Sequence, residues 1–284
     1  MPTLIARNLK TLKKALSSQR FKNKKNGLVP TMGSIHKGHL ALVNKSIKLC
    51  ETTIVTIFVN PIQFNNREDL KNYPTAIGND IEILTQKKVD LIFIPNIRDM
   101  YPQDFSTYIN LNKFSDILCG KKRKGHFSGV ATVVMKLLSL IQPQCAFFGE
   151  KDYQQLIIIK KLVKDFNLNV KIYPVKTVRD KNGLALSSRN KLLNKEQKIK
   201  ASKINTILNK ITLKSFNGKK KPLHLIKKNL NLNGIYKIEY LEIRDEKFLE
   251  LFTSKGRNIN NYRIFIAVKI GKVRLIDNVR LLAK

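Results

Sequence analysis

The chain has 284 residues, of which 43% are hydrophobic, so it is long enough to bury a sizeable core. Its richest apolar stretch, Val130–Ile141, is interrupted by Lys136 and is shorter than the roughly 20 residues that cross a bilayer, which argues against a membrane protein. The 54 Lys and Arg residues against 20 Asp and Glu give a formal charge of +34, a balance that would ordinarily indicate a nucleic-acid partner.

The first predicted elements alternate between strand and helix. Residues Met1–Arg20 are basic and loosely amphipathic, without the continuous apolar segment of a secretory signal. Gly27–Thr31 is a short apolar strand, His39–Cys50 is an amphipathic helix and Thr52–Val59 is a second strand. The pattern then recurs with a helical stretch at Asp80–Lys87 and a strand at Leu91–Ile94. Such alternation predicts a parallel sheet.

The same alternation continues through the middle of the chain. The sequence predicts a buried helix, a strand, a second helix and a further strand at Gly129–Ile141, Cys145–Phe148, Tyr153–Phe166 and Val170–Tyr173. We therefore predict a doubly wound, Rossmann-like α/β domain over residues 1–176.

After about Val175 the pattern changes. A basic helical segment, Asn194–Lys214, is followed by a linker around Gly218–Pro222. Alternating runs at Tyr236–Ile243 and Arg263–Val268 then predict strands. Residues 177–284 are expected to form a smaller α+β domain.

The segment between the first strand and the first helix carries chemistry. It reads Pro30–His39 and holds two glycines and two histidines where ligands of doubly wound sheets bind. Gly33 and Gly38 allow close backbone approach, and the start of the helix offers N–H groups to an anion. A lone histidine is more often structural, but His36 and His39, as a pair after a strand, suit a triphosphate.

Most of the positive charge has a simpler explanation than nucleic acid. Only 12 of the 54 basic residues are Arg, and the Lys excess accompanies many Asn and Ile residues, as in an AT-rich coding sequence. We therefore predict a solvated basic surface and no nucleic-acid partner. The three cysteines, Cys50, Cys119 and Cys145, are far apart and odd in number, which indicates reduced thiols and a cytoplasmic protein.

Five blocks of sequence resemble one enzyme family. His36-Lys37-Gly38-His39 is similar to the His-x-Gly-His signature of class I aminoacyl-tRNA synthetases and nucleotidylyltransferases. With its flanking Pro-Thr-Met-Gly, that block and four others resemble pantothenate synthetases (pantoate–β-alanine ligases). The other four blocks are Phe58–Phe64, Gly125–Val130, Phe148–Leu156 and Thr177–Asn190.

The resemblance implies an activity and a set of site residues. Family members form an amide between pantoate and β-alanine with ATP and Mg2+, through a pantoyl-adenylate, and are expected to be homodimers. The resemblance also implies that the domain of residues 177–284 closes over the active site. The residues expected to act catalytically are His36, His39, Lys151 and Arg189. Those expected around ATP are Met32, Gly33, Ser34, Ile35, His36, Lys37, Gly38, His39, Gly149, Glu150, Lys151, Asp152, Val178, Leu186, Ser187, Ser188 and Arg189. Those expected around pantoate or β-alanine are Asn60, Gln63 and Gln155.

The residue types agree with these roles. Gln63 and Gln155 are neutral amides at strand ends, able to bind the hydroxyls and carboxylate of a small polyhydroxy acid without adding charge. Lys151 stands at a strand-to-helix junction, where its ammonium could reach a phosphate, and Asp152 is a candidate ribose or helix-cap partner. Ser187–Arg189 supplies two hydroxyls and a guanidinium for departing pyrophosphate, with Gly183 as a hinge.

The sequence departs from the family pattern at four positions. Thr75, Lys124 and Lys176 replace the Arg, Pro and Pro usual in the family, which affects local loop geometry and any anion contact of that Arg. Lys37 stands where the family often has an acid and adds positive charge next to the expected triphosphate site.

Other functions compete with the resemblance. Another small-molecule adenylyltransferase would leave Gln63 and Gln155 unexplained. A tRNA-charging fragment would lack room for an anticodon-binding module after residue 190, and a non-catalytic basic binding protein would not need intact blocks.

Overall fold

The computed structural model describes residues 1–210, 221–235, 237–252 and 261–281. Its larger sheet has six strands, all parallel, in the order β1-β4-β3-β2-β5-β6. These strands are β1 (Leu4–Ala6), β2 (Asn26–Thr31), β3 (Thr52–Ile57), β4 (Leu91–Phe93), β5 (Cys145–Gly149) and β6 (Lys171–Val175). From β2 the chain adds β3 and β4 on one side, and it then adds β5 and β6 on the other side of β2. This reversal makes the sheet doubly wound.

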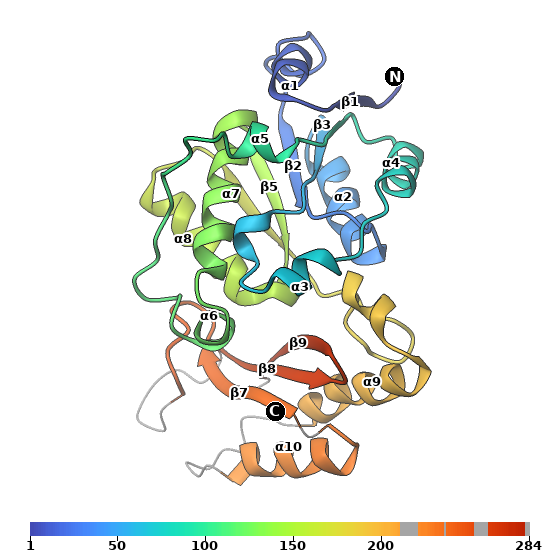
Figure 1. Ribbon diagram of the computed structural model, residues 1–284, viewed down its shortest axis with the longest axis vertical. Helices are drawn as coiled ribbons and strands as arrows, with labels where there is room; N and C mark the ends of the chain where they lie inside the picture. The colour runs from blue at the N-terminus through green and yellow to red at the C-terminus, as the bar shows by residue number, and fades with distance from the viewer. Residues whose placement is uncertain (211–220, 236, 253–260, 282–284) are drawn as a thin grey trace.

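Both faces of this sheet are covered because its central strands are apolar on both sides. Every residue of β3 is buried. Leu28 and Ile54 point into a core shared with the helices on one face, whereas Val29 and Val55 point into the core on the other. Figure 1 shows α7 (His126–Ile141) and α8 (Tyr153–Asp165) on one side of the sheet, with α2 (Lys37–Leu49) and α4 (Ile77–Gln86) on the other.

The remaining helices of this part are short. Asn8 caps α1 with a reciprocal side-chain and backbone pair to Thr11, which satisfies backbone N–H groups at the start of that helix. The short helices are α1 (Leu9–Leu16), α3 (Arg67–Lys71), α5 (Ile97–Met100) and α6 (Leu118–Lys122), with 3-10 turns η1 (Pro61–Gln63) and η2 (Glu150–Asp152).

The C-terminal part is a three-stranded antiparallel sheet in the order β7-β8-β9. Its strands are β7 (Lys237–Asp245), β8 (Tyr262–Ile270) and β9 (Val273–Arg280). The central β8 is almost wholly buried and packs with α9 (Lys195–Asn209) and α10 (Lys221–Leu232) in a separate apolar cluster, which also holds Leu193 beside the 3-10 turn η3 (Ser188–Leu192). In Figure 1 this sheet lies below the parallel sheet, between it and α10.

The predicted α/β fold with a smaller α+β part is confirmed, with differences at particular elements. The sequence did not predict β1, which is only three residues long, or β9, whose apolar positions alternate with Arg, Asp and Asn. The helix predicted from Gly129 begins at His126, because the left-handed Gly125 precedes it. The helix predicted for Asn194–Lys214 ends at Asn209, and residues 211–214 lie outside the described residues.

Two further predictions fall partly on residues that the structure does not describe. Most of the predicted linker, residues 218–220, and Tyr236 of the predicted strand lie outside the described residues. Lys221 and Pro222 begin α10 instead of continuing a linker. Within the described ranges, none of the helices has both the length and the hydropathy needed to cross a membrane.

Candidate active site

The predicted residues gather where β2 and β5 end. These neighbouring strands lie where the sheet reverses its winding, so the loops that follow them diverge and leave a crevice. A cavity of about 240 Å³ occupies it. The predicted residues that line this cavity are Met32, His36, Gly38, His39, Asn60, Gln63, Gly149, Lys151, Asp152, Gln155, Val178, Leu186, Ser187, Ser188 and Arg189.

The loop after β2 is held from behind by a carboxylate. Gly33 and Ser34 have φ values of 82° and 51°, and this left-handed turn aims the N–H groups of Ser34 and Ile35 away from the cavity. Both donate, at 2.7 Å each, to the fully buried Asp80 of α4. Three predicted ATP residues, Gly33, Ser34 and Ile35, therefore lie beside the cavity, and Lys37 is exposed.

The two histidines are neutral and face one another. Their rings stack with centroids 4.0 Å apart. Burial, reinforced by the charge of Lys151, lowers the pKa of His36 to about 4. Burial also lowers the pKa of His39 to about 3. His36 caps α2 by accepting the Gly38 N–H at Nδ1 (3.1 Å), so its proton is on Nε2 and is a donor for a ligand.

His39 is the second histidine that lines the cavity. Its Nδ1 is buried and has no hydrogen-bond partner among the residues that the structure describes. Together the rings can donate to phosphate oxygens without bringing a second and third cation beside Lys151.

The loop after β5 supplies the cation. Lys151 is mostly buried, and its ammonium lies 3.8 Å from the Asp152 carboxylate. Asp152 occupies the N-cap position of α8, yet its side chain makes none of the capping hydrogen bonds in the described structure, so the helix-cap alternative is wrong and the carboxylate pairs with Lys151 instead. Glu150 faces the C-terminal sheet, with its carboxylate 3.9 Å from Arg263.

An uncharged polar region adjoins the cation. Gln63 and Gln155 both line the cavity. Asn60 is buried behind them: its amide donates to the Gln63 side chain (3.1 Å) and to the Gly129 carbonyl, and its oxygen accepts from Tyr101. Asn60 therefore orients Gln63 in this structure, although its own contact with pantoate stays a prediction.

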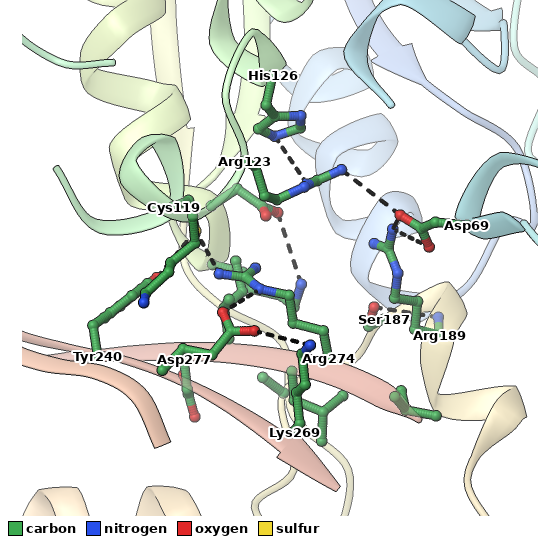
Figure 2. A pocket seen from close by; sticks show the side chains of 18 of the residues that line it. Asp69, Cys119, Arg123, His126, Ser187, Arg189, Tyr240, Lys269, Arg274 and Asp277 are labelled. Carbon is green, nitrogen blue, oxygen red and sulfur yellow. Dashed lines mark hydrogen bonds and ion pairs between the residues drawn. The ribbon is translucent and has the colours of Figure 1, made fainter. Parts of the chain in front are cut away.

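Sequence reasoning missed several charged or titratable residues here. Arg123 and His126 line both the 240 Å³ cavity and a second, interdomain cavity of about 950 Å³, and Asp69 lines the second. The Asp69 carboxylate accepts from Arg189 at 2.9 and 3.1 Å and lies 3.7 Å from Arg123 (Figure 2). His126 lies inside the recognised block Gly125–Val130 and Arg123 lies two residues before it, and this position was the signal that could have found them.

His126 connects this cluster to the polar region. Its Nδ1 lies 2.8 Å from the Gln63 carbonyl, and its Nε2 lies 3.1 Å from the Arg123 guanidinium. Since a carbonyl only accepts and a guanidinium only donates, His126 is neutral with its proton on Nδ1. Burial, followed by the charge of Arg123, lowers its pKa to about 3.

The fold and cavity define an α/β enzyme that binds a polyphosphate next to a small polar acid. Comparison with known proteins specifies the family. The model of the pantoate–β-alanine ligase family matches residues 4–280, and the chain belongs to that family. A pantothenate synthetase of Buchnera aphidicola subsp. Schizaphis graminum is 44% identical over 286 residues, which cover 99% of each protein.

Solved structures agree. The crystal structure of pantothenate synthetase from Thermus thermophilus has a TM-score of 0.90 at 34% identity and covers 98% of this chain and 99% of that one. A pantoate–β-alanine ligase from Francisella tularensis, complexed with β-γ ATP and β-alanine, has a TM-score of 0.84 at 41% identity, with 98% and 97% covered.

The first prediction concerns the pH dependence of stability. Folding keeps His126 neutral, whereas the unfolded imidazole binds a proton below its ordinary pKa of 6.5. As the pH falls below 6.5, protonation of His126 in the unfolded chain therefore lowers the free energy of unfolding by about 1.4 kcal/mol per pH unit. Above pH 6.5 this histidine does not change the free energy of unfolding. In urea unfolding at pH 5, 6 and 7.5, His126→Asn should lose less stability on acidification than wild type. Parallel losses would contradict the assignment.

The second prediction concerns Asp69. Replacing it with Asn removes the anion that competes with phosphates for Arg189 and Arg123, so pyrophosphate should bind about threefold to tenfold more tightly by calorimetry. Glu68→Gln is the matched control, since Glu68 lies on the same short helix and lines the same interdomain cavity. Weaker binding in Asp69→Asn, or an equal gain in the control, would show that Asp69 does not compete.

Proposed function

We propose that the chain condenses (R)-pantoate with β-alanine, using ATP, to give pantothenate, AMP and diphosphate through an enzyme-bound pantoyl-adenylate. The observation that carries this proposal is one cavity with two chemically different halves. His36, His39 and Lys151 offer donors to phosphate, and Gln63 and Gln155 offer uncharged amides to a hydroxy acid. Membership of the pantoate–β-alanine ligase family supports it.

The first step needs positioning more than proton transfer. The carboxylate of pantoate, with an ordinary pKa of roughly 4, is already ionised near neutral pH and needs no general base. Gln63, oriented by Asn60, and Gln155 would hold the acid with its carboxylate toward the α-phosphorus. Neutral histidines, Lys151 and Arg189 would then stabilise the charge that grows on the phosphates as the phosphorus–oxygen bond to pyrophosphate breaks.

The second step forms the amide. The β-alanine amine attacks the acyl carbon of the mixed anhydride, and AMP leaves with the oxygen that had attacked phosphorus. The two cavities share Arg123, His126, Lys151 and Ser187 on their walls, so the interdomain cavity gives pyrophosphate a way out and the second substrate a way in. Enclosure between the two sheets limits hydrolysis of the anhydride.

We infer that Mg2+ enters with ATP. The described residues contain no group of three His, Cys, Asp or Glu side chains arranged to hold a metal. Magnesium is commonly held by one or two carboxylates together with substrate phosphates and water. The half-exposed Asp152 carboxylate fits that role, and the ion would offset phosphate charge during adenylation.

We further infer the organisation of the protein. The separate apolar cluster begins at Leu184, which supports a boundary near residues 176 and 177, although Leu249 and Phe265 of the C-terminal part pack into the first core. The three cysteines, all in described segments, are free thiols, which supports a cytoplasmic location. A homodimer is proposed from the family resemblance.

The third prediction tests the proposed function. With Mg2+ and labelled pyrophosphate but without β-alanine, the enzyme should exchange label into ATP only when pantoate is present, because pantoate supplies the attacking carboxylate. β-Alanine alone should support no exchange. His39→Ala and Lys151→Ala should lower the maximal exchange rate by about 100-fold or more. Gln63→Ala and Gln155→Ala should mainly raise the pantoate concentration needed for half-maximal exchange.

The reactions without pantoate and the comparison of the four variants are the controls. Exchange without pantoate would contradict the substrate assignment. The same loss in maximal rate for all four variants would leave the substrate standing and contradict the division between a phosphate half and a pantoate half of the cavity.

A further inference from the structure

Two consecutive residues of β9 contact both loops that the proposed function assigns to ATP. Asp277 and Asn278 are buried, and because they are neighbours on a strand their side chains leave it on opposite faces. One reaches the loop after β5, which carries Lys151. The other reaches the hairpin that leads into Ser187–Arg189. The C-terminal sheet thus contacts two segments that are distant in sequence.

Asn278 holds the backbone of the lysine loop. Its Nδ2 donates to the carbonyls of Glu150 (3.0 Å) and Lys151 (2.9 Å). Its Oδ1 accepts from Arg263 at 2.6 Å. Both ends of the amide are therefore committed, so the side chain cannot rotate without breaking hydrogen bonds among buried groups.

Arg263 is itself fixed. Its guanidinium lies 4.0 Å from the centre of the Tyr153 ring and pairs with Glu246 at 2.9 Å. Tyr153 is the first residue of α8, directly after the lysine loop, so the arginine contacts both Asn278 and the helix that this loop begins. The position of Lys151 therefore depends on contacts with the C-terminal sheet.

Asp277 holds the other loop. It accepts two hydrogen bonds from the Arg179 guanidinium, at 2.6 and 2.8 Å. Arg179 also donates to the Gly183 carbonyl and bridges to Ala185, and the Leu186 N–H donates to the Val178 carbonyl. This hairpin, residues 178–186, is followed at once by Ser187–Arg189.

We propose that Asp277 and Asn278 are positioning residues for adenylation: Asn278 sets the place of Lys151, and Asp277 sets the place of the Ser187–Arg189 segment, so that both reach one triphosphate. This inference rests on the proposed function and extends it. The C-terminal sheet then does more than cover the site, because two adjacent side chains fix the distance between its two cationic segments. Neither residue needs to touch the substrates to do so.

A purely structural role makes a different prediction. If Asn278 only joined the two parts of the protein, its loss would slow the reaction by the same factor whatever stands at position 151. If it acts through Lys151, its loss should matter only while the ammonium is present. A double-mutant cycle separates these alternatives, because residues acting as a unit are non-additive.

The fourth prediction is that cycle. Asn278→Ala should lower the maximal pantoate-dependent exchange rate by about 10-fold to 100-fold, the size expected when a reacting group is misplaced by about 1 Å. In the Lys151→Ala background the same change should cost about twofold or less. The pantoate concentration for half-maximal exchange should stay within about twofold of wild type, since the Asn278 side chain hydrogen-bonds to neither Gln63 nor Gln155. Asp277→Asn should instead raise the ATP concentration for half-maximal exchange about tenfold.

Asn26→Ala is the matched control. Asn26 is 8% exposed against 4% for Asn278, and its Nδ2 also donates to a backbone carbonyl, that of Phe21. It lies at the start of β2, at the opposite end from the site. This variant should lower the melting temperature and leave the exchange rate within about twofold of wild type.

The outcomes are distinct. Equal losses in both backgrounds, or an equal loss in Asn26→Ala, would overturn the proposal. If Asn278→Ala does not fold, Asn278→Asp keeps the shape but places a carboxylate oxygen against two carbonyls, and the same cycle applies to it. Absence of exchange in the wild-type enzyme would refute the proposed function itself, which separates the two failures.

Discussion

The site depends on the reversal of winding at β2. That strand has β3 on one side and β5 on the other, so the chain leaves its carboxyl end and that of β5 in opposite directions. The stacked histidines follow β2 and the lysine follows β5, and the crevice brings them together. Asp80 completes the arrangement, because its carboxylate takes the N–H groups of Ser34 and Ile35 and fixes the turn that presents His36.

Burial explains why a chain with a charge of +34 keeps three histidines of the site neutral. It lowers the pKa of His36, His39 and His126, so these rings add nothing to the charge of Lys151 and Arg123. The cations that remain are held by carboxylates, as Arg189 and Arg123 are by Asp69 (Figure 2). We propose that a polyphosphate displaces this internal anion.

Local patterns predicted what depends on local sequence. Apolar runs identified β2, β3 and β5, and the recognised blocks placed His36, His39, Lys151 and Gln155 in one cavity. Contacts between segments that are far apart in the chain leave no such pattern in the sequence. Asp80 accepts hydrogen bonds from two residues that precede it by 45 and 46 positions, and Asp277 pairs with an arginine that precedes it by 98 positions. A three-residue edge strand such as β1 is too short to show alternation. The hydrogen bond from Asn60 to Gln63 likewise needed coordinates, because the sequence does not show which side chain the Asn60 amide contacts.

The central claim is that pantoate's carboxylate attacks the α-phosphorus of ATP within this crevice. It is tested most directly with pantoate carrying heavy oxygen in both carboxylate positions, in a full reaction with ATP, Mg2+ and β-alanine. Mass spectrometry of the products should find one heavy oxygen in AMP and one in the new amide, because the oxygen that attacks phosphorus leaves with it. Heavy oxygen in orthophosphate, with ADP in place of AMP, would mean an acyl-phosphate route and would contradict adenylation.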